Sequence, residues 1–166
     1  GEVQHLEMLC EDFKPEGEIF DNFLMNTVIP YVENNFPVCT DRQNVAVCGS
    51  SSGGLMSFFS AVERPEKFGY AGVFSPAFLC YTREDWAKYL STKIVENMPY
   101  LYIYTGNGDE LEEMIFESTE MLYELLEESF YPYDRMNEVI LFENAHNEKS
   151  WREIFPDFLH TFLSRL

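Results

Sequence analysis

Positively charged side chains are scarce in this chain. Its 166 residues include 11 lysines and arginines against 29 aspartates and glutamates, which gives a formal net charge of -18 at pH 7. A surface of this charge repels phosphate groups, so we expect neither nucleic acid nor an anionic membrane surface as a partner. The excess of acidic residues is most simply explained by a solvated surface.

Long apolar segments are missing as well. No apolar run approaches the length of a membrane span, and the sequence shows no signal peptide, a segment that processing removes from secreted proteins. We therefore expect a cytoplasmic protein without a membrane partner, or a secreted one if a signal has been cleaved.

Cysteines and histidines are few, with four of the first and three of the second. The cysteines form neither a C-x-x-C pair nor the spacing typical of metal ligands, so the sequence predicts no metal and no cofactor. We interpret all four as small core residues, which suits a reducing compartment. They are Cys10, Cys39, Cys48 and Cys80.

The apolar content is high enough for one globular domain. Hydrophobic residues make up 46% of the chain and aromatic residues 16%, and 166 residues can bury a sizeable core. Strand-like runs alternate with helix-like segments, which predicts a parallel sheet covered by helices on both faces. The expected strands are 45–48, 70–74, 100–104 and 139–142, and the expected helices are 55–63, 84–96, 111–129 and 151–163.

The beginning of the chain is less regular. Residues 1–20 are interpreted as a loop or a remnant strand, with residues 3–9 as the strand candidate. A helix follows, with Asp21 as its N-cap. Pro30, which has no backbone N–H to donate, should either kink this helix or mark its effective start. We assign residues 1–166 to a single α/β domain.

The sequence around Ser51 predicts a nucleophile elbow. An apolar run ends at Gly49, three serines follow, and Gly53 precedes a helical segment, which gives the pattern G-x-S-x-G. At such a strand-to-helix turn the positions two before and two after the serine approach each other, so only glycine fits easily. The turn lifts the Ser51 hydroxyl above the sheet edge and points the backbone N–H of Ser52 toward a forming oxyanion. A flexible linker is the alternative, but linkers are not enclosed by a buried-type strand and an apolar helix.

Two further residues follow other strands and complete a catalytic set. Asp109 ends the turn after the third strand and His146 lies in the loop after the fourth, which gives the chain order Ser, Asp, His of α/β-hydrolase triads. A serine hydroxyl needs a base to take its proton, and an imidazole held by a carboxylate supplies one near neutral pH. Ligands of parallel sheets bind at the carboxyl ends of the strands, where all three residues are expected.

Competing residues exist for each role. They are Glu110, Glu112 and Glu113 for the acid, His5 and His160 for the base, and Ser75 and Ser118 for the nucleophile. The turn could present any of the three glutamates to the histidine. The other histidines lie near the terminus and within the last helix, and the other serines lack flanking glycines.

These motifs resemble the esterase-D-like family of α/β-hydrolases, which includes feruloyl and acetyl-xylan esterases, S-formylglutathione hydrolases, enterobactin-type esterases and mycolyltransferases. The resemblance covers roughly residues 20–166 and is carried by segments 23–32, 49–54, 64–68 and 106–109 and by His146 followed by Trp151 and Arg152. It implies Ser51 as the nucleophile, Asp109 as the acid and His146 as the base.

The resemblance also implies a function. It points to a serine carboxylesterase that forms an acyl-enzyme on a small or carbohydrate-linked ester. An acyltransferase with the same triad and a non-catalytic binding domain of the same fold are the alternatives. Family members begin with several more strands, which the residues before 20 are too few to form, and a loop among those strands supplies a second oxyanion-hole donor. We therefore expect an open sheet edge through which the chain can form oligomers.

Overall fold

A four-stranded parallel sheet forms the centre of the protein. The computed structural model describes residues 17–93 and 97–165, and within them the strands are ordered β1-β2-β3-β4. Their bounds are Ala46–Ser50 for β1, Tyr70–Phe74 for β2, Tyr100–Thr105 for β3 and Met136–Ile140 for β4. All neighbouring strands are parallel, so the carboxyl ends of all four lie along one edge of the sheet.

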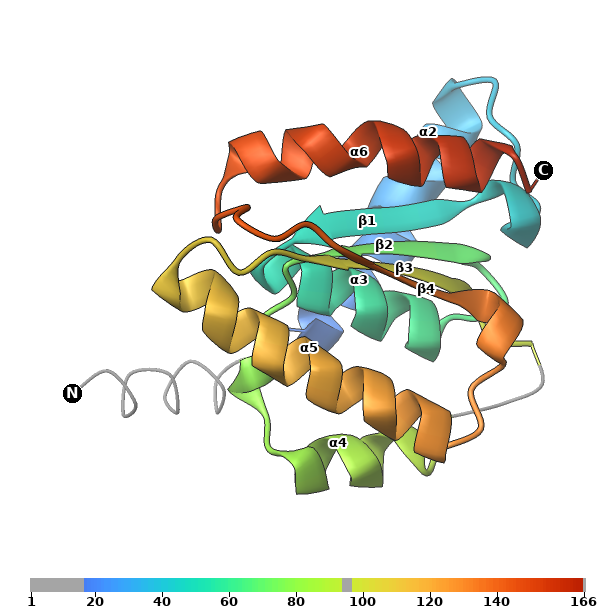
Figure 1. Cartoon of the computed structure of the whole chain (residues 1–166). Helices are drawn as coiled ribbons and strands as arrows, with labels where there is room; N and C mark the ends of the chain where they lie inside the picture. Colours follow the sequence, from blue (N-terminus) through green and yellow to red (C-terminus); the bar gives the residue numbers. More distant parts are fainter. Residues whose placement is uncertain (1–16, 94–96, 166) are drawn as a thin grey trace.

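Helices cover both faces of this sheet, as the sequence predicted (Figure 1). In chain order, the helical segments are residues 17–23, η1 Leu24–Val28, α2 Ile29–Asn35, η2 Arg42–Asn44, α3 Ser52–Glu63, η3 Phe78–Cys80, α4 Arg83–Leu90, α5 Glu110–Glu128, η4 Tyr133–Arg135 and α6 Glu148–Leu163. In Figure 1, α6 lies on one face, while α3 and α5 lie on the other with α4 outside them. Among the described residues, no helix combines the length and the apolar character needed to cross a membrane.

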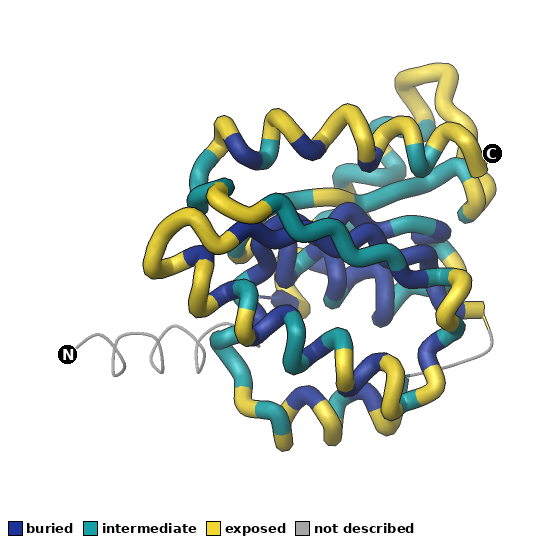
Figure 2. The backbone as a smooth tube through the Cα atoms, in the orientation of Figure 1, coloured by how far each residue is buried: buried dark blue, intermediate teal, exposed yellow. Residues whose placement is uncertain are grey.

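The connections between strands explain this arrangement. Crossovers between parallel strands are almost always right-handed, so three successive crossovers in one direction place α3, α4 and α5 on the same face. The last helix, α6, takes the opposite face. Two buried clusters result, one between the sheet and α3 to α5 around Phe58 and Leu122, and a smaller one beneath α6 around Tyr102 and Phe158. Every residue of β3 is buried, as expected of a central strand (Figure 2).

The first helix begins earlier than the sequence predicted. Residues 17–20, expected as loop or strand, are helical, and Asp21 is buried inside the helix instead of capping it. The carboxylate of Asp21 forms an ion pair of 2.8 Å with Arg64, at the end of α3, which explains its burial. The expected irregularity at Pro30 is a π-helical turn, Leu24–Val28, directly before α2, because proline cannot continue the α-helical hydrogen bonding.

Other boundaries also differ from the expectation. The last strand is Met136–Ile140, about three residues earlier than predicted, because the polar pair Asn137 and Glu138 concealed it. The short helix α4 ends at Leu90 and not at residue 96. The strand candidate at 3–9 lies outside the described residues.

The interpretation of the cysteines as core residues was wrong for those that the structure describes. Cys39 and Cys48 are exposed, and Cys80 is partly buried. Cys48 belongs to β1, which within the described residues pairs only with β2 and so has one free edge. An apolar strand sequence does not reveal that the strand lies at an edge. Cys10 and His5 lie outside the described residues.

Candidate active site

Ser51 occupies a sharp turn directly after β1. Its backbone has φ 56° and ψ -123°, a region that is rarely populated by residues with a side chain. Its N–H donates to the carbonyl of Phe74 at 3.0 Å, and its own carbonyl accepts from Ala77 at 3.1 Å. These hydrogen bonds, to the end of β2 and to the loop after it, hold the strained residue in place. The geometry is that of the predicted strand–turn–helix elbow.

The glycines around Ser51 have unequal roles. A Cβ atom on Gly49 would lie 2.6 Å from the carbonyl oxygen of Gly53, so this position excludes other residues. A Cβ atom on Gly53 would meet nothing within 4 Å, contrary to the expectation that both flanking positions need glycine. The second crowded position is Gly54, where a Cβ atom would lie 2.8 Å from the carbonyl oxygen of Phe74.

His146 reaches Ser51 from the loop between β4 and α6. Its Nε2 lies 3.0 Å from the hydroxyl oxygen of Ser51. The loop rests on the turn after β3, where Gly108 donates its N–H to the carbonyl of Asn144 at 2.8 Å. A Cβ atom on Gly106 would lie 2.2 Å from that same carbonyl oxygen, so the two backbones pack directly against each other. The structure therefore brings together the serine and the histidine that the sequence selected.

The carboxylate against the imidazole belongs to Glu112. Its Oε2 lies 2.7 Å from Nδ1 of His146. Its Oε1 accepts from the hydroxyl of Ser75 at 2.6 Å and from the N–H of Gly106 at 2.8 Å. The side chain is fully buried, and hydrogen bonds at both oxygens offset the cost of burying its charge. Because a carboxylate only accepts, Nδ1 of His146 donates, which leaves the lone pair of Nε2 facing Ser51.

Asp109 lies beside His146 but forms its hydrogen bond with the backbone and not with the ring. One oxygen caps α5 by accepting from the N–H of Glu112 at 2.8 Å, and the other accepts from the backbone N–H of His146 at 2.7 Å. The hydrogen bond from the Glu112 N–H is the main reason why the pKa of Asp109 is below its ordinary value. The structure thus places Asp109 as an N-cap and presents Glu112, one of the open alternatives, to the imidazole.

A helical periodicity in the sequence could have identified Glu112. The buried side of α5 includes Glu112, Ile115, Thr119 and Leu122, which recur at spacings of three and four residues. Glu112 falls on this apolar stripe, whereas Glu110 and Glu113 lie off it and are exposed. A glutamate on the inward stripe one turn into a helix needs a buried partner.

Ser75 and Trp151 are two more residues of this site. The indole N–H of Trp151 donates to the Ser75 hydroxyl oxygen at 2.9 Å. The Trp151 ring stands nearly perpendicular to the imidazole of His146, with ring centroids 5.1 Å apart. The sequence suggested Ser75 only as a competing nucleophile and did not indicate that Trp151 lies in the site. His146 is therefore surrounded by Ser51, Glu112 and Trp151.

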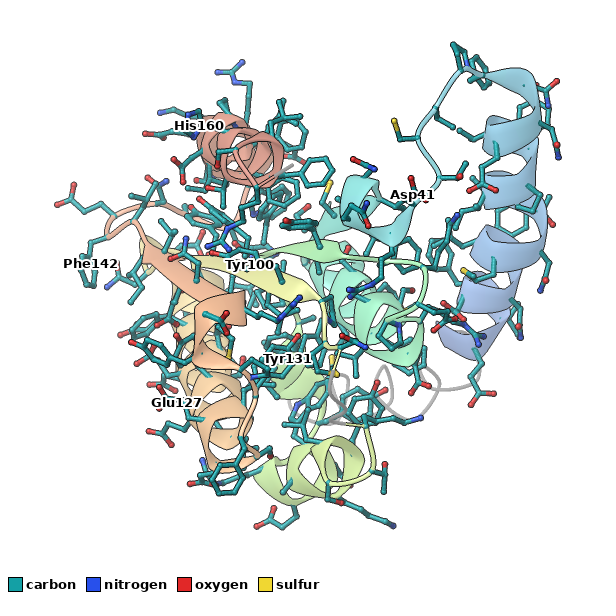
Figure 3. The ribbon with its side chains drawn as sticks, turned by 90° about the vertical axis from the view of Figure 1, so that its right-hand side faces the viewer. Asp41, Tyr100, Glu127, Tyr131, Phe142 and His160 are labelled. Atoms are coloured by element: carbon teal, nitrogen blue, oxygen red, sulfur yellow. The ribbon has the colours of Figure 1, made fainter. Side chains whose placement is uncertain are left out.

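The other candidates lie elsewhere. His160 is exposed on α6 (Figure 3), and Ser118 donates to the carbonyl of Ile115 within α5 at 2.9 Å. Ser52 is the first residue of α3, whose initial N–H groups have no partner within the helix and carry a partial positive charge. Across the described residues, no group of three or more histidine, cysteine or acidic side chains could hold a metal ion.

A family model described as "Putative esterase" matches residues 9–162. The chain belongs to this family. The membership confirms the resemblance that the motifs indicated. The matched segment includes the elbow of Ser51, the loop of His146 and the side chain of Glu112.

Known proteins similar to this chain include feruloyl, ferulic acid and enterobactin esterases. Over 107 residues, 64% of the chain, it is 33% identical to an endo-1,4-beta-xylanase/feruloyl esterase of Xylanibacter ruminicola. The enterobactin esterase of Shigella flexneri aligns with 87% of the chain at a TM-score of 0.75 and 18% identity. A ferulic acid esterase of Anaeromyces mucronatus aligns with 84% at a TM-score of 0.63 and 20% identity.

These similarities confirm the α/β-hydrolase fold. They extend over only part of each relative, since the aligned segments cover 13% of the Xylanibacter protein, 38% of the Shigella chain and 52% of the Anaeromyces chain. The chain therefore spans at most about half the length of these three relatives.

Proposed function

We propose that the protein is a serine carboxylesterase in which Ser51, His146 and Glu112 form the catalytic triad. The observation that carries this proposal is the continuous hydrogen-bonded series from the Ser51 hydroxyl through the imidazole to a buried carboxylate. Membership of the esterase family supports the same reaction class. Asp109, the acid expected from the resemblance, has instead a supporting role through the backbone of His146.

The geometry supports a definite sequence of proton transfers. Nε2 of His146 takes the proton of Ser51 as the oxygen attacks the ester carbonyl, and the buried carboxylate of Glu112 stabilises the imidazolium that forms. The backbone N–H of Ser52, at the positive end of α3, donates to the developing oxyanion. His146 then protonates the leaving alcohol, and a water molecule activated by the same imidazole hydrolyses the acyl-enzyme.

The names of the relatives favour esters of aromatic acids as substrates. Two of them are named for ferulic or feruloyl esters, and one of these joins that activity to a xylanase. We propose that this protein hydrolyses an ester between an aromatic acid and a carbohydrate or another small alcohol.

The direct test is covalent labelling of the protein with a fluorophosphonate, followed by mass spectrometry of its peptides. We expect one adduct on Ser51, none in the Ser51→Ala variant, and unchanged labelling in Ser118→Ala, which removes a hydroxyl elsewhere. Ser51→Ala should also lower kcat on feruloyl esters by about 10³-fold or more. A folded protein that stays unlabelled, or a variant that keeps normal turnover, would refute the proposal.

A further inference from the structure

Ser75 occupies an unusual position directly after β2. It is fully buried, and its backbone has φ 40°, in the region that favours glycine. Its N–H donates to the carbonyl of Tyr104 on the neighbouring strand at 2.7 Å. A residue with a side chain adopts this conformation only at a cost in free energy. Glycine would relieve that cost but would have no hydroxyl, which suggests that the contacts of the hydroxyl offset the strain.

The hydroxyl of Ser75 joins two side chains that flank the imidazole. It donates to Oε1 of Glu112 at 2.6 Å and accepts from the indole N–H of Trp151 at 2.9 Å. The other oxygen of Glu112 holds Nδ1 of His146, and the Trp151 ring packs edge-on against the imidazole. Each donor and each acceptor in this series has a consistent partner, so the arrangement of hydrogen atoms is determined.

We propose that Ser75 is a positioning residue of the esterase site. Its hydroxyl fixes the rotation of the Glu112 carboxylate, and its link to Trp151 fixes the plane of the imidazole. Together these contacts keep Nε2 of His146 aimed at the Ser51 oxygen, at the observed 3.0 Å. The inference rests on the proposed function, because positioning has a catalytic effect only if His146 acts as the base.

A positioning role predicts a specific change in the kinetics when the Ser75 hydroxyl is removed. Without the Ser75 hydroxyl, Oε1 of Glu112 keeps only the N–H of Gly106 as a donor, and the carboxylate can turn away from the imidazole. Displacement of a catalytic group by about 1 Å can cost up to about 10²-fold in rate. We therefore expect a loss in kcat of about 10–100-fold with KM changed less than about threefold, because Ser75 is fully buried and has no surface to offer a substrate.

The test compares Ser75→Ala with Ser75→Gly. Both variants remove the hydroxyl, but only glycine accepts a positive φ without strain, so their stabilities should differ while their kcat values fall together. Equal losses in kcat would support positioning. Near-normal kcat in Ser75→Gly would overturn it, because the hydroxyl would then be dispensable. Ser60→Ala is the matched control, because it also removes a buried serine hydroxyl but on α3, away from the site. It should keep wild-type kcat.

A double-mutant cycle tests whether Ser75 acts through Glu112. In a Glu112→Gln background, Ser75→Ala should reduce kcat by less than about twofold, because the carboxylate that it positions is already gone. Full additivity of the two losses would contradict the proposal. Trp151→Phe, which keeps a ring but removes the indole N–H, should cause a smaller loss than Ser75→Ala.

A proton NMR measurement separates this inference from the proposed function. The Nδ1 proton of His146, bonded to a carboxylate, should give a far-downfield resonance in the wild type that is missing in Glu112→Gln. Ser75→Ala should broaden or shift this resonance, while Ser60→Ala should not. An unchanged resonance in Ser75→Ala overturns the positioning role whether or not the protein hydrolyses esters. An unlabelled Ser51 together with an altered resonance would instead refute the esterase function alone.

Discussion

At the scale of single residues, two carboxylates three positions apart hold His146 in different ways. Glu112 contacts the imidazole, whereas Asp109 contacts the backbone of the same residue and caps α5. The difference follows from the helix, since position 109 precedes its first turn and position 112 points inward. Substitution of each carboxylate by its amide should therefore affect different properties of the protein.

We predict that Glu112→Gln lowers kcat by about 10²–10⁴-fold with little change in KM, because the imidazolium loses its buried counter-charge. Asp109→Asn should retain most of the turnover and lower the free energy of unfolding by at most about 1 kcal/mol, since asparagine also caps helices. Steady-state kinetics and urea unfolding of both variants check this assignment. A larger loss of kcat in Asp109→Asn than in Glu112→Gln would return the catalytic role to the aspartate.

The acidic residue Glu138 makes stability depend on pH. Burial and the neighbouring carboxyl of Glu120 raise the pKa of Glu138, on β4, to about 7, from an ordinary value of 4.5. The folded state therefore binds a proton that the unfolded state releases, so this group's contribution to stability is present below pH 4.5 and is lost as the pH rises to about 7.

Glu138→Gln should remove this dependence. We expect its free energy of unfolding to exceed that of the wild type by about 1 kcal/mol at pH 8 and to be nearly equal at pH 4.5, with the magnitude reduced by solvent screening. Urea unfolding at both pH values measures the difference. Glu117→Gln, an exposed substitution on α5, serves as the control and should leave the slope unchanged. An equal effect of Glu138→Gln at both pH values would contradict the prediction.

At the scale of elements, α6 carries part of the site, and Phe158 is one of the buried side chains that hold it against the sheet. Phe158 is 4% exposed and packs edge-on against Phe74 and Tyr102, with ring centroids 5.5 Å away in both cases. The rings fit closely, because a Cβ atom on Gly72 of β2 would lie 3.0 Å from the Phe158 ring. Since Trp151 lies on the same helix, the packing of Phe158 also supports the site.

We predict that Phe158→Ala lowers the free energy of unfolding by about 3–5 kcal/mol, the usual cost of removing a buried phenylalanine. Phe155→Ala, on the same helix but 42% exposed, should cost less than about 1 kcal/mol. Thermal and urea unfolding of the two variants compare the positions directly. Similar costs for both would mean that α6 is not held to the sheet through Phe158.

The elements that the sequence predicted well are those whose pattern is local. Strand β2 matches its expected range of 70–74, and β3 extends its range by one residue, because both are apolar runs bounded by breakers. The edge strand β4 was misplaced because Asn137 and Glu138 interrupt its apolar run. The same contrast between local and long-range patterns explains which parts of the site the sequence predicted. The elbow of Ser51 is a contiguous motif, whereas the contact between Glu112 and His146 joins residues 34 positions apart and depends on which side of α5 faces inward.

At the scale of the whole molecule, β1 leaves one edge of the described sheet unpaired. Within the described residues β1 pairs only with β2. Beside its other edge lies a groove of about 480 Å³, lined by residues that include Phe20, Cys48 and Met56. Phe20 and Phe23, on the helix next to this groove, are 48% and 53% exposed. An unpaired strand edge beside apolar side chains is a common route to association.

We predict that the isolated chain associates with itself in a concentration-dependent way and that salt strengthens this association. Copies with a net charge of -18 repel each other at long range, and 0.5 M salt screens that repulsion to within about 4 Å. Light scattering coupled to size-exclusion chromatography, at low and high salt, measures the mass.

Cys48→Lys should weaken association about tenfold or more, equivalent to about 1.4 kcal/mol, because a charge on the edge strand opposes pairing. Met114→Lys, which makes the same charge change at an exposed position of α5, should have no such effect. A monomer under all conditions, or equal effects of the two lysines, would show that the β1 edge is not an association surface.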